Sequence, residues 1–189
     1  MAKNKITYGL SNAHVWPITA VSEAGVPTYG DIINMPGATA LTLDAEGSSD
    51  PFYADDTVYY QGVSNNGYSG SITLADLPEE FLTKVLNEVV DKNGARFEDA
   101  SATPNEFAIA FEFKGDQAKR RHVFYRCVAT RPSVGSTTKE DAVAPNTQEL
   151  AFTAIPRLDN NFVKARAEEG DTAYATWYGA TPYEFEAQA

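Results

Sequence analysis

The chain has 189 residues, of which 43% are hydrophobic and 22% are charged, and its 26 acidic and 15 basic residues give a net charge of −11. A chain of this length buries roughly 70% of its unfolded surface, so we expect one globular domain, residues 1–189, that needs no disulfide or metal support. The single cysteine, Cys127, excludes an internal disulfide framework and multi-cysteine zinc sites, and the strong negative charge disfavours binding to a nucleic-acid backbone.

Short runs of alternating apolar and polar residues, typical of half-buried strands, dominate the chain. Strands are predicted, in chain order, at 39–45, 57–63, 68–75, 107–113, 122–130 and 149–155, with weaker candidates at 6–10 and 173–178. Asn66 and Gly67 form an Asn-Gly signal for a tight reversal between the second and third of these. Gly115 and Asp116 supply turn residues that predict a long hairpin from 107–113 and 122–130.

The strand at 107–113 has the clearest two-sided pattern. One face carries the large apolar residues Phe107, Ile109, Phe111 and Phe113, and the other carries Ala108, Ala110, Glu112 and Lys114.

One segment, at about 77–91, has helical periodicity. Its apolar residues form one stripe: Leu77, Phe81, Leu82, Val85, Leu86, Val89 and Val90. Asp76 is placed as an N-cap with Glu79 three residues later, and Gly94 follows as a stop signal. The chain is therefore predicted to be mainly β with one α-helix: two packed antiparallel sheets, as a sandwich or barrel, flanked by the helix.

Two segments lack a regular pattern and are predicted to be interaction loops. The first, 46–56, carries the aromatic residues Phe52 and Tyr53, which on an exposed loop would favour contact with a partner. The second, 132–147, has few large apolar residues and is long for a connection inside a compact domain.

Charge is segregated along the sequence. Between Lys5 and Lys84 there are ten acidic residues and no Lys or Arg, whereas basic residues gather in and after the predicted hairpin from Lys114 to Arg131. We expect an electrostatically bipolar molecule, which suits head-to-tail contact between copies. The alternative interpretation is that the acidic and basic clusters are solvent-exposed faces that take no part in contacts between copies.

No motif supports catalysis. Gly67-Tyr68-Ser69-Gly70-Ser71 departs from G-x-S-x-G at its last position. Asp44, Glu46 and Asp50 do not have the spacing of an EF-hand. A hydrolase remains open only because carboxylates are plentiful, and no spacing singles out a pair. We therefore predict no catalytic, cofactor or metal site and no enzymatic activity.

An aromatic cluster lies near the C-terminus: Trp177, Tyr178, Tyr183 and Phe185. These side chains either pin the terminal segment against the domain or a neighbouring copy, or line a carbohydrate-binding surface. A β-sandwich carbohydrate-binding module is thus the alternative function.

Four stretches together resemble a known family: GLSNAHVWPI from Gly9, MPGATALTLDAEGSSDPFYADDTVYYQG from Met35, FAIAFEFKGDQAKRRHVFYRCVATRPSVGSTTKEDAV from Phe107, and TQELAFTAIPRLDN from Thr147. They are similar to the major tail protein, or tail tube protein, of long-tailed, non-contractile bacteriophages. The resemblance covers about residues 9–160. It implies a β-sandwich or barrel with one helix that assembles as sixfold rings stacked into a hollow tube.

The resemblance also implies a location and partners. The subunit would be assembled in the host bacterial cytoplasm into the virion tail, without a membrane partner. It would contact itself, the tail terminator and tail tip proteins, and the tape measure protein in the lumen, while DNA passes without specific binding.

By analogy with tail tube subunits, the loop at 46–56 reaches an adjacent ring. Acidic and aromatic residues there are then expected to face basic residues of the next copy. The inter-subunit contact residues predicted in this way are Asp50, Phe52, Tyr53, Asp55, Asp56, Lys119, Arg120 and Arg121.

Overall fold

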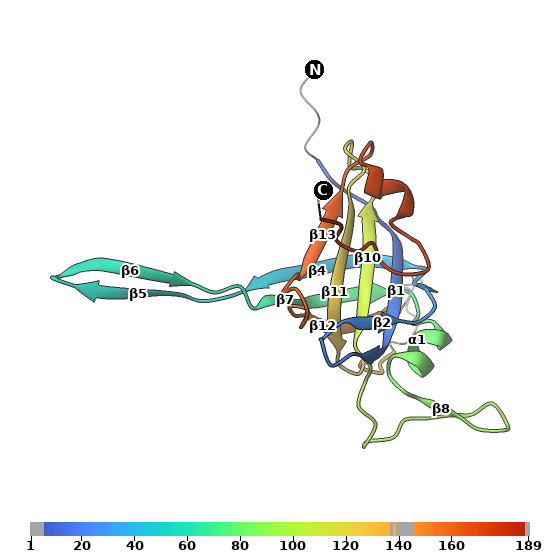
Figure 1. The fold of residues 1–189 in the computed structure, drawn as a ribbon. Helices are drawn as coiled ribbons and strands as arrows, with labels where there is room; N and C mark the ends of the chain where they lie inside the picture. The colour runs from blue at the N-terminus through green and yellow to red at the C-terminus, as the bar shows by residue number, and fades with distance from the viewer. Residues whose placement is uncertain (1–5, 137, 139–145, 188–189) are drawn as a thin grey trace.

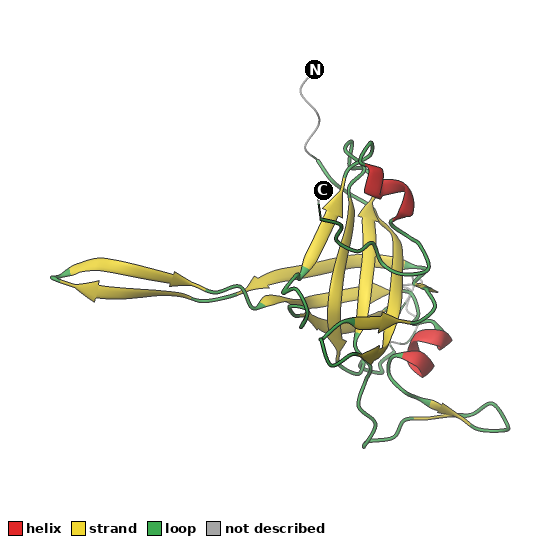
Figure 2. Cartoon of the chain, in the orientation of Figure 1, coloured by secondary structure: helices red, strands yellow, loops and turns green. Residues whose placement is uncertain are grey.

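The structure, a computed structural model, describes residues 6–136, 138 and 146–187 and is dominated by β-strands (Figures 1 and 2). Its strands are β1 (Leu10–Val21), β2 (Pro27–Tyr29), β3 (Ile33–Asn34), β4 (Ala38–Glu46), β5 (Ser49–Ala54), β6 (Thr57–Val63), β7 (Gly67–Leu74), β8 (Val89–Val90), β9 (Arg96–Phe97), β10 (Phe107–Phe113), β11 (Arg121–Ala129), β12 (Gln148–Ala154) and β13 (Lys164–Ala167). Across these residues there is one α-helix, α1 (Glu79–Lys84), and one 3₁₀ helix (Thr172–Thr176). Neither is long and apolar enough to cross a membrane.

Nine of these strands form one antiparallel sheet in the order β2-β1-β10-β11-β12-β7-β4, with β3 paired to β1 and β13 paired to β11. The sheet divides at β11, because β12 pairs with its residues 127–129 and β13 with its residues 121–124. In Figure 1, β4 and β7 run crosswise to β1, β10 and β11. The prediction of a mainly β fold with one helix is confirmed, and its layers are consistent with a β-sandwich.

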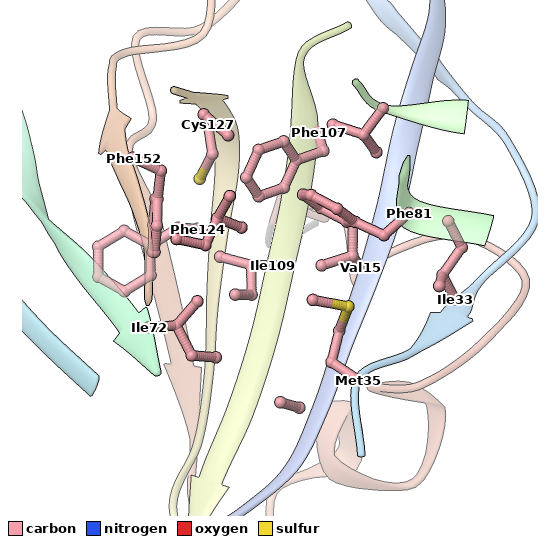
Figure 3. Close-up of a cluster of buried hydrophobic side chains, with 14 of the residues drawn as sticks. Val15, Ile33, Met35, Ile72, Phe81, Phe107, Ile109, Phe124, Cys127 and Phe152 are labelled. Carbon is pink, nitrogen blue, oxygen red and sulfur yellow. The ribbon is translucent and has the colours of Figure 1, made fainter. Parts of the chain in front are cut away.

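The main hydrophobic core is assembled from β1, β3, β7, β10, β11, β12 and α1 (Figure 3). Its largest side chains are almost completely buried, and they include Met35, Phe81, Phe107, Ile109 and Phe152. The Phe107 ring lies 5.6 Å from that of Phe81 and 5.9 Å from that of Phe152. Burial of each such side chain contributes roughly 1.5–3 kcal/mol, which holds the helix and the strands together.

The second face of β10 is buried as well. Ala108 and Ala110, predicted to lie opposite the large apolar residues, belong to a separate buried cluster with Trp16 and Trp177. The C-terminal segment supplies Trp177 to this cluster and so covers the outer face of the sheet. β10 is therefore a central strand that is buried on both faces.

The predicted helix is shorter than the periodic pattern. Instead of 77–91, α1 covers only Glu79–Lys84, and the chain leaves the helical conformation at Asn87, whose φ is +60°. Phe81 and Val85 are buried as the pattern requires, but Val89 and Val90 form the exposed strand β8.

The expected helix signals also act differently. Asp76 does not cap the helix: its carboxylate accepts a hydrogen bond from the backbone N–H of Leu77, and Pro78 occupies the N-cap position. Gly94, with φ of +84°, lies between the paired strands β8 and β9 instead of ending the helix.

Most of the predicted strands are present within a residue or two: 39–45, 57–63, 68–75, 107–113, 122–130 and 149–155 correspond to β4, β6, β7, β10, β11 and β12. The hairpin of β10 and β11 is confirmed. The two weaker predictions are wrong, because residues 6–9 precede β1 and residues 172–176 form the 3₁₀ helix. The twelve-residue strand β1 escaped prediction, since it contains Pro17 and a register shift between Ser11 and His14 interrupts its alternation.

β4 through β7 form one long, bent hairpin. Glu46 pairs with Gly67 on the β4–β7 side, and Ser49 pairs with Val63 on the β5–β6 side, so the two ribbons follow each other. The reversal predicted at residues 65–67 is wrong. The chain turns at Asp55 and Asp56, whose φ values of +50° and +59° are those of a two-residue type I′ turn.

Candidate interface for self-assembly

The outer half of the long hairpin, residues 48–64, extends away from the body of the molecule, and we call it the arm (Figure 1). The segment predicted as a loop at 46–56 is thus largely strand β5. The arm supplies no residue to either hydrophobic cluster, although six of its side chains are large, apolar and exposed: Phe52, Tyr53, Val58, Tyr59, Tyr60 and Val63.

Both faces of the arm carry apolar side chains. Residues directly opposite in an antiparallel pair lie on the same face, so Phe52 shares one face with Tyr60, and Tyr53 shares the other with Val58. A strand at the surface of a domain normally turns its apolar face to the core. Neither face of the arm has a core to meet, so both are available to other molecules.

The arm is also acidic. Asp50, Asp55 and Asp56 are exposed, and none of them takes part in an ion pair with another described residue. Asp50 accepts a hydrogen bond of 2.9 Å from the Ser48 hydroxyl. The predicted acidic and aromatic contact residues therefore do lie together, on one projecting element.

The base of the arm is held by a small set of hydrogen bonds. The backbone N–H of Ser64 donates to the carbonyl of Ser48 at 2.9 Å, and the N–H of Ser48 donates to the Ser64 hydroxyl at 2.9 Å. Gly67 follows at φ +108°, where a Cβ would lie 1.9 Å from the carbonyl oxygen of Ala154. Only glycine fits there, so the start of β7, where the arm joins the body, is sterically fixed against β12.

The predicted basic contact residues Lys119, Arg120 and Arg121 lie at the turn of the hairpin formed by β10 and β11. They are not part of the arm. Each has a partner in its own chain: Lys119 pairs with Glu169, and Arg120 with Glu168 at 3.1 Å. Arg121 pairs with Glu112 at 3.1 Å, and its guanidinium lies 3.7 Å from the ring centroid of Tyr174. A contact with the arm of another copy would have to compete with these intramolecular pairs.

Two basic residues that the sequence analysis did not select lie on β13. Lys164 and Arg166 are exposed, and within the described chain neither forms an ion pair. The signal was the alternation Lys-Ala-Arg-Ala, which places both cations on one face of a strand and both alanines on the other.

The C-terminal aromatic residues pin the terminal segment to the body. Trp177 is only 1% exposed, stacks on Tyr183 at 5.4 Å, and donates from its indole N–H to the carbonyl of His122. The buried guanidinium of Arg157 adds an ion pair of 2.5 Å to Glu184. A sugar ring would have to displace the segment before it could stack on Trp177, whereas Phe185 is exposed.

β4 is the last strand of the large sheet and is nine residues long. It pairs with β7, and within the described part of the chain no strand pairs with its opposite edge. The outer face of β4, β7 and β12 is polar, with Asp44 on β4 and Glu149 on β12 exposed. Glu149 accepts a hydrogen bond of 2.6 Å from the Ser71 hydroxyl.

Of the second predicted interaction loop, 132–147, residues 137 and 139–145 lie outside the described residues. In the part of the chain that is described, no three His, Cys, Asp or Glu side chains are grouped so that they could hold a metal ion. Burial raises the pKa of the Cys127 thiol far above its usual value, so this cysteine is held as an uncharged core residue.

No protein-family model matches the sequence. No curated protein matches it at a significant level either. Membership of the tail tube family therefore stays a prediction.

Proposed function

We propose that this chain is the repeating subunit of a tube of stacked rings, the tail tube of a long-tailed bacteriophage, and that it acts by self-assembly without catalysis. The arm is the observation that carries this proposal. A two-stranded hairpin is marginally stable alone in water, and exposed apolar side chains on both its faces favour burial against other chains.

The energy available from the arm is large enough for assembly. Complete burial of one large apolar side chain contributes roughly 1.5–3 kcal/mol, and the arm presents six of them. Part of this gain offsets the loss of translational and rotational freedom on association. Repetition of the contact around a closed ring adds further stability, because the neighbouring contacts hold each arm close to its partner.

The outer edge of β4 supports contacts within a ring. No described strand pairs with this edge, and unpaired backbone groups of a strand pair readily with a strand from a neighbouring copy. Strand pairing of this kind would join the polar layer of β4, β7 and β12 into a continuous wall.

The polar layer suits the wall of a bore that conducts DNA. Neither β4, β7 nor β12 contains a Lys or Arg, and their outer face presents Asp44 and Glu149. Carboxylates repel phosphates and leave their counterions in place, so DNA would pass without being held.

Negative-stain electron microscopy of the concentrated protein tests the proposal, with an arm-deleted variant as the control. In that variant, residues 49–63 are replaced by Asn-Gly, so that Ser48 and Ser64 close a two-residue turn around their existing hydrogen bond. We expect rings or tubes from the wild-type protein and none from the variant. Wild-type protein that stays monomeric at every concentration and salt tested contradicts the proposal.

A further inference from the structure

The surface that would receive the arm is carried by β13 and the adjoining ends of β10 and β11. Arg166 pairs across the strands with His122, and Lys164 with Phe124, so all four side chains lie on one face. Phe111 stacks on His122 at 5.5 Å, and Phe113 contacts the same imidazole edge-on at 5.6 Å.

The burial of the side chains on this face decreases from the core towards the surface. Phe111 and Phe124 are buried, His122 and Phe113 are partly exposed, and Lys164 and Arg166 are exposed. We call Phe113, His122, Lys164 and Arg166 the β13 shelf.

The ammonium group of Lys164 lies 4.3 Å from the ring centroid of Tyr68, at the start of β7. The shelf therefore combines aromatic surface with two cations that are free of ion pairs among the described residues.

The cations of the shelf also act on its histidine. Burial, followed by the charges of Lys164, Arg166 and Arg120, lowers the pKa of His122, whereas the charge of Asp116 raises it. The neighbouring cations at the turn of the β10–β11 hairpin differ, because Lys119, Arg120 and Arg121 are already paired with carboxylates of their own chain. Lys164 and Arg166 are not neutralised by any described carboxylate, so the shelf keeps charge for a partner.

The arm is complementary to the shelf in both charge and chemistry. It brings three exposed aspartates, Asp50, Asp55 and Asp56, together with Phe52 and the tyrosines beside it. The arm points away from its own body in Figure 1, so its tip does not contact the shelf of its own chain.

We infer that the arm of one copy docks on the β13 shelf of a second copy, with the aspartates of the arm facing Lys164 and Arg166 and the aromatic side chains packed against Phe113 and His122. This inference rests on the proposed self-assembly and names the contact through which it proceeds. Exposed charge pairs are screened by salt, so the contact weakens as ionic strength rises.

A charge swap between two variants tests the inference. The first variant carries Lys164→Glu with Arg166→Glu, and the second carries Asp55→Lys with Asp56→Lys. We expect each variant alone to associate roughly tenfold more weakly than the wild type in sedimentation velocity, because like charges then face each other. An equal mixture of the two recovers association, since each arm finds a complementary shelf on the other variant.

Lys92→Glu with Lys114→Glu is the matched control, because it reverses two exposed cations outside the shelf and is expected to leave association unchanged. Circular dichroism and thermal unfolding of each variant separate a lost contact from a lost fold.

The outcomes separate this inference from the proposed function. If the shelf variant assembles like the wild type while the arm-deleted variant does not, the shelf is excluded and self-assembly through the arm stands. If wild-type protein never associates, the proposed function fails. If wild-type protein binds a DNA oligonucleotide through Lys164 and Arg166 without associating, the shelf is a nucleic-acid site and the inference is overturned.

Discussion

Phe52 and Tyr60 lie directly opposite each other on β5 and β6, and they remain 61% and 66% exposed. Such a pair normally stabilises a sheet by packing on a core layer beneath it. Here the pair belongs to an arm whose other face is also apolar, so its burial depends on a second molecule. This relationship distinguishes the chain from a self-contained β-sandwich.

Replacement of Phe52 and Tyr60 by Ser should abolish assembly while the subunit stays folded. Neither residue belongs to a hydrophobic cluster, so we expect a thermal unfolding midpoint within a few degrees of the wild type and a loss of high-mass species in light scattering. The matched control is Phe97→Ser on β9, a phenylalanine of similar exposure at 58%. Equal loss of assembly in both variants would contradict the claim that assembly depends specifically on the arm.

Trp177→Ala should act on stability. Truncation of a buried tryptophan costs about 3–5 kcal/mol through lost burial and the cavity that remains. We expect a lower midpoint in urea unfolding, with Phe185→Ala, on the same segment but exposed, close to the wild type. If Trp177→Ala is as stable as the wild type and instead loses binding on a glycan array, the result supports the carbohydrate-binding alternative. It would contradict the role of Trp177 in holding the C-terminal segment against the body.

Stability should fall on mild acidification because of His122. Its pKa in the folded protein is depressed below the usual 6.5 by burial and by neighbouring cations, so the unfolded chain binds more protons in this range. The free energy of unfolding therefore decreases as the pH falls through 6.5 towards the depressed value. Urea unfolding between about pH 7.5 and pH 5.5 should show a smaller decrease in His122→Gln. Identical pH dependence in the two proteins would contradict this assignment.

The proposed bore wall makes a prediction for assembled tubes. Asp44→Lys with Glu149→Lys places basic charge on the outer face of β4 and β12, where the wild type has none. We expect variant tubes to bind a fluorescent DNA oligonucleotide, with binding lost at high salt, while wild-type tubes do not bind. Glu23→Lys with Glu186→Lys, at exposed acids outside this layer, is the control. Binding by the control tubes alone would assign the bore to another surface.

Sequence reasoning located the strands in which large apolar residues alternate with small or polar ones. Alternation identified β10 and β11, because Phe107 and Ile109 face one core. The burial of Ala108 was not predictable, since it depends on Trp177 arriving from nearly seventy residues later in the chain. Local periodicity contains no information on such contacts between residues far apart in the sequence.

Of the two strands of the arm, β6 was predicted as a strand, whereas the segment of β5 was recognised by its aromatic residues but predicted as a loop. β5 has no alternation because both of its faces are exposed, so its sequence lacks the pattern that a core imposes. The turn was misplaced because Asn66-Gly67 is the stronger turn signal than Asp55-Asp56. Gly67 is instead required by the close approach of Ala154.

The sequence predicted which types of residue would be available for contact better than it predicted which basic residues would be free to make it. Asp50, Phe52 and their neighbours do lie together on the arm. The availability of a cation, however, depends on whether a carboxylate folds onto it. Glu169 pairs with Lys119 in this way, whereas Lys164 on β13 has no carboxylate partner among the described residues. Only the tertiary structure distinguishes the two.

The most direct measurement of the central claim is electron cryomicroscopy of purified protein at high concentration, followed by helical reconstruction of any filaments. The account predicts a hollow tube of stacked rings in which each arm is buried against a neighbouring copy and the bore is lined by carboxylates. A bore lined by lysine and arginine, arms left in solvent, or a protein that never forms filaments would contradict it.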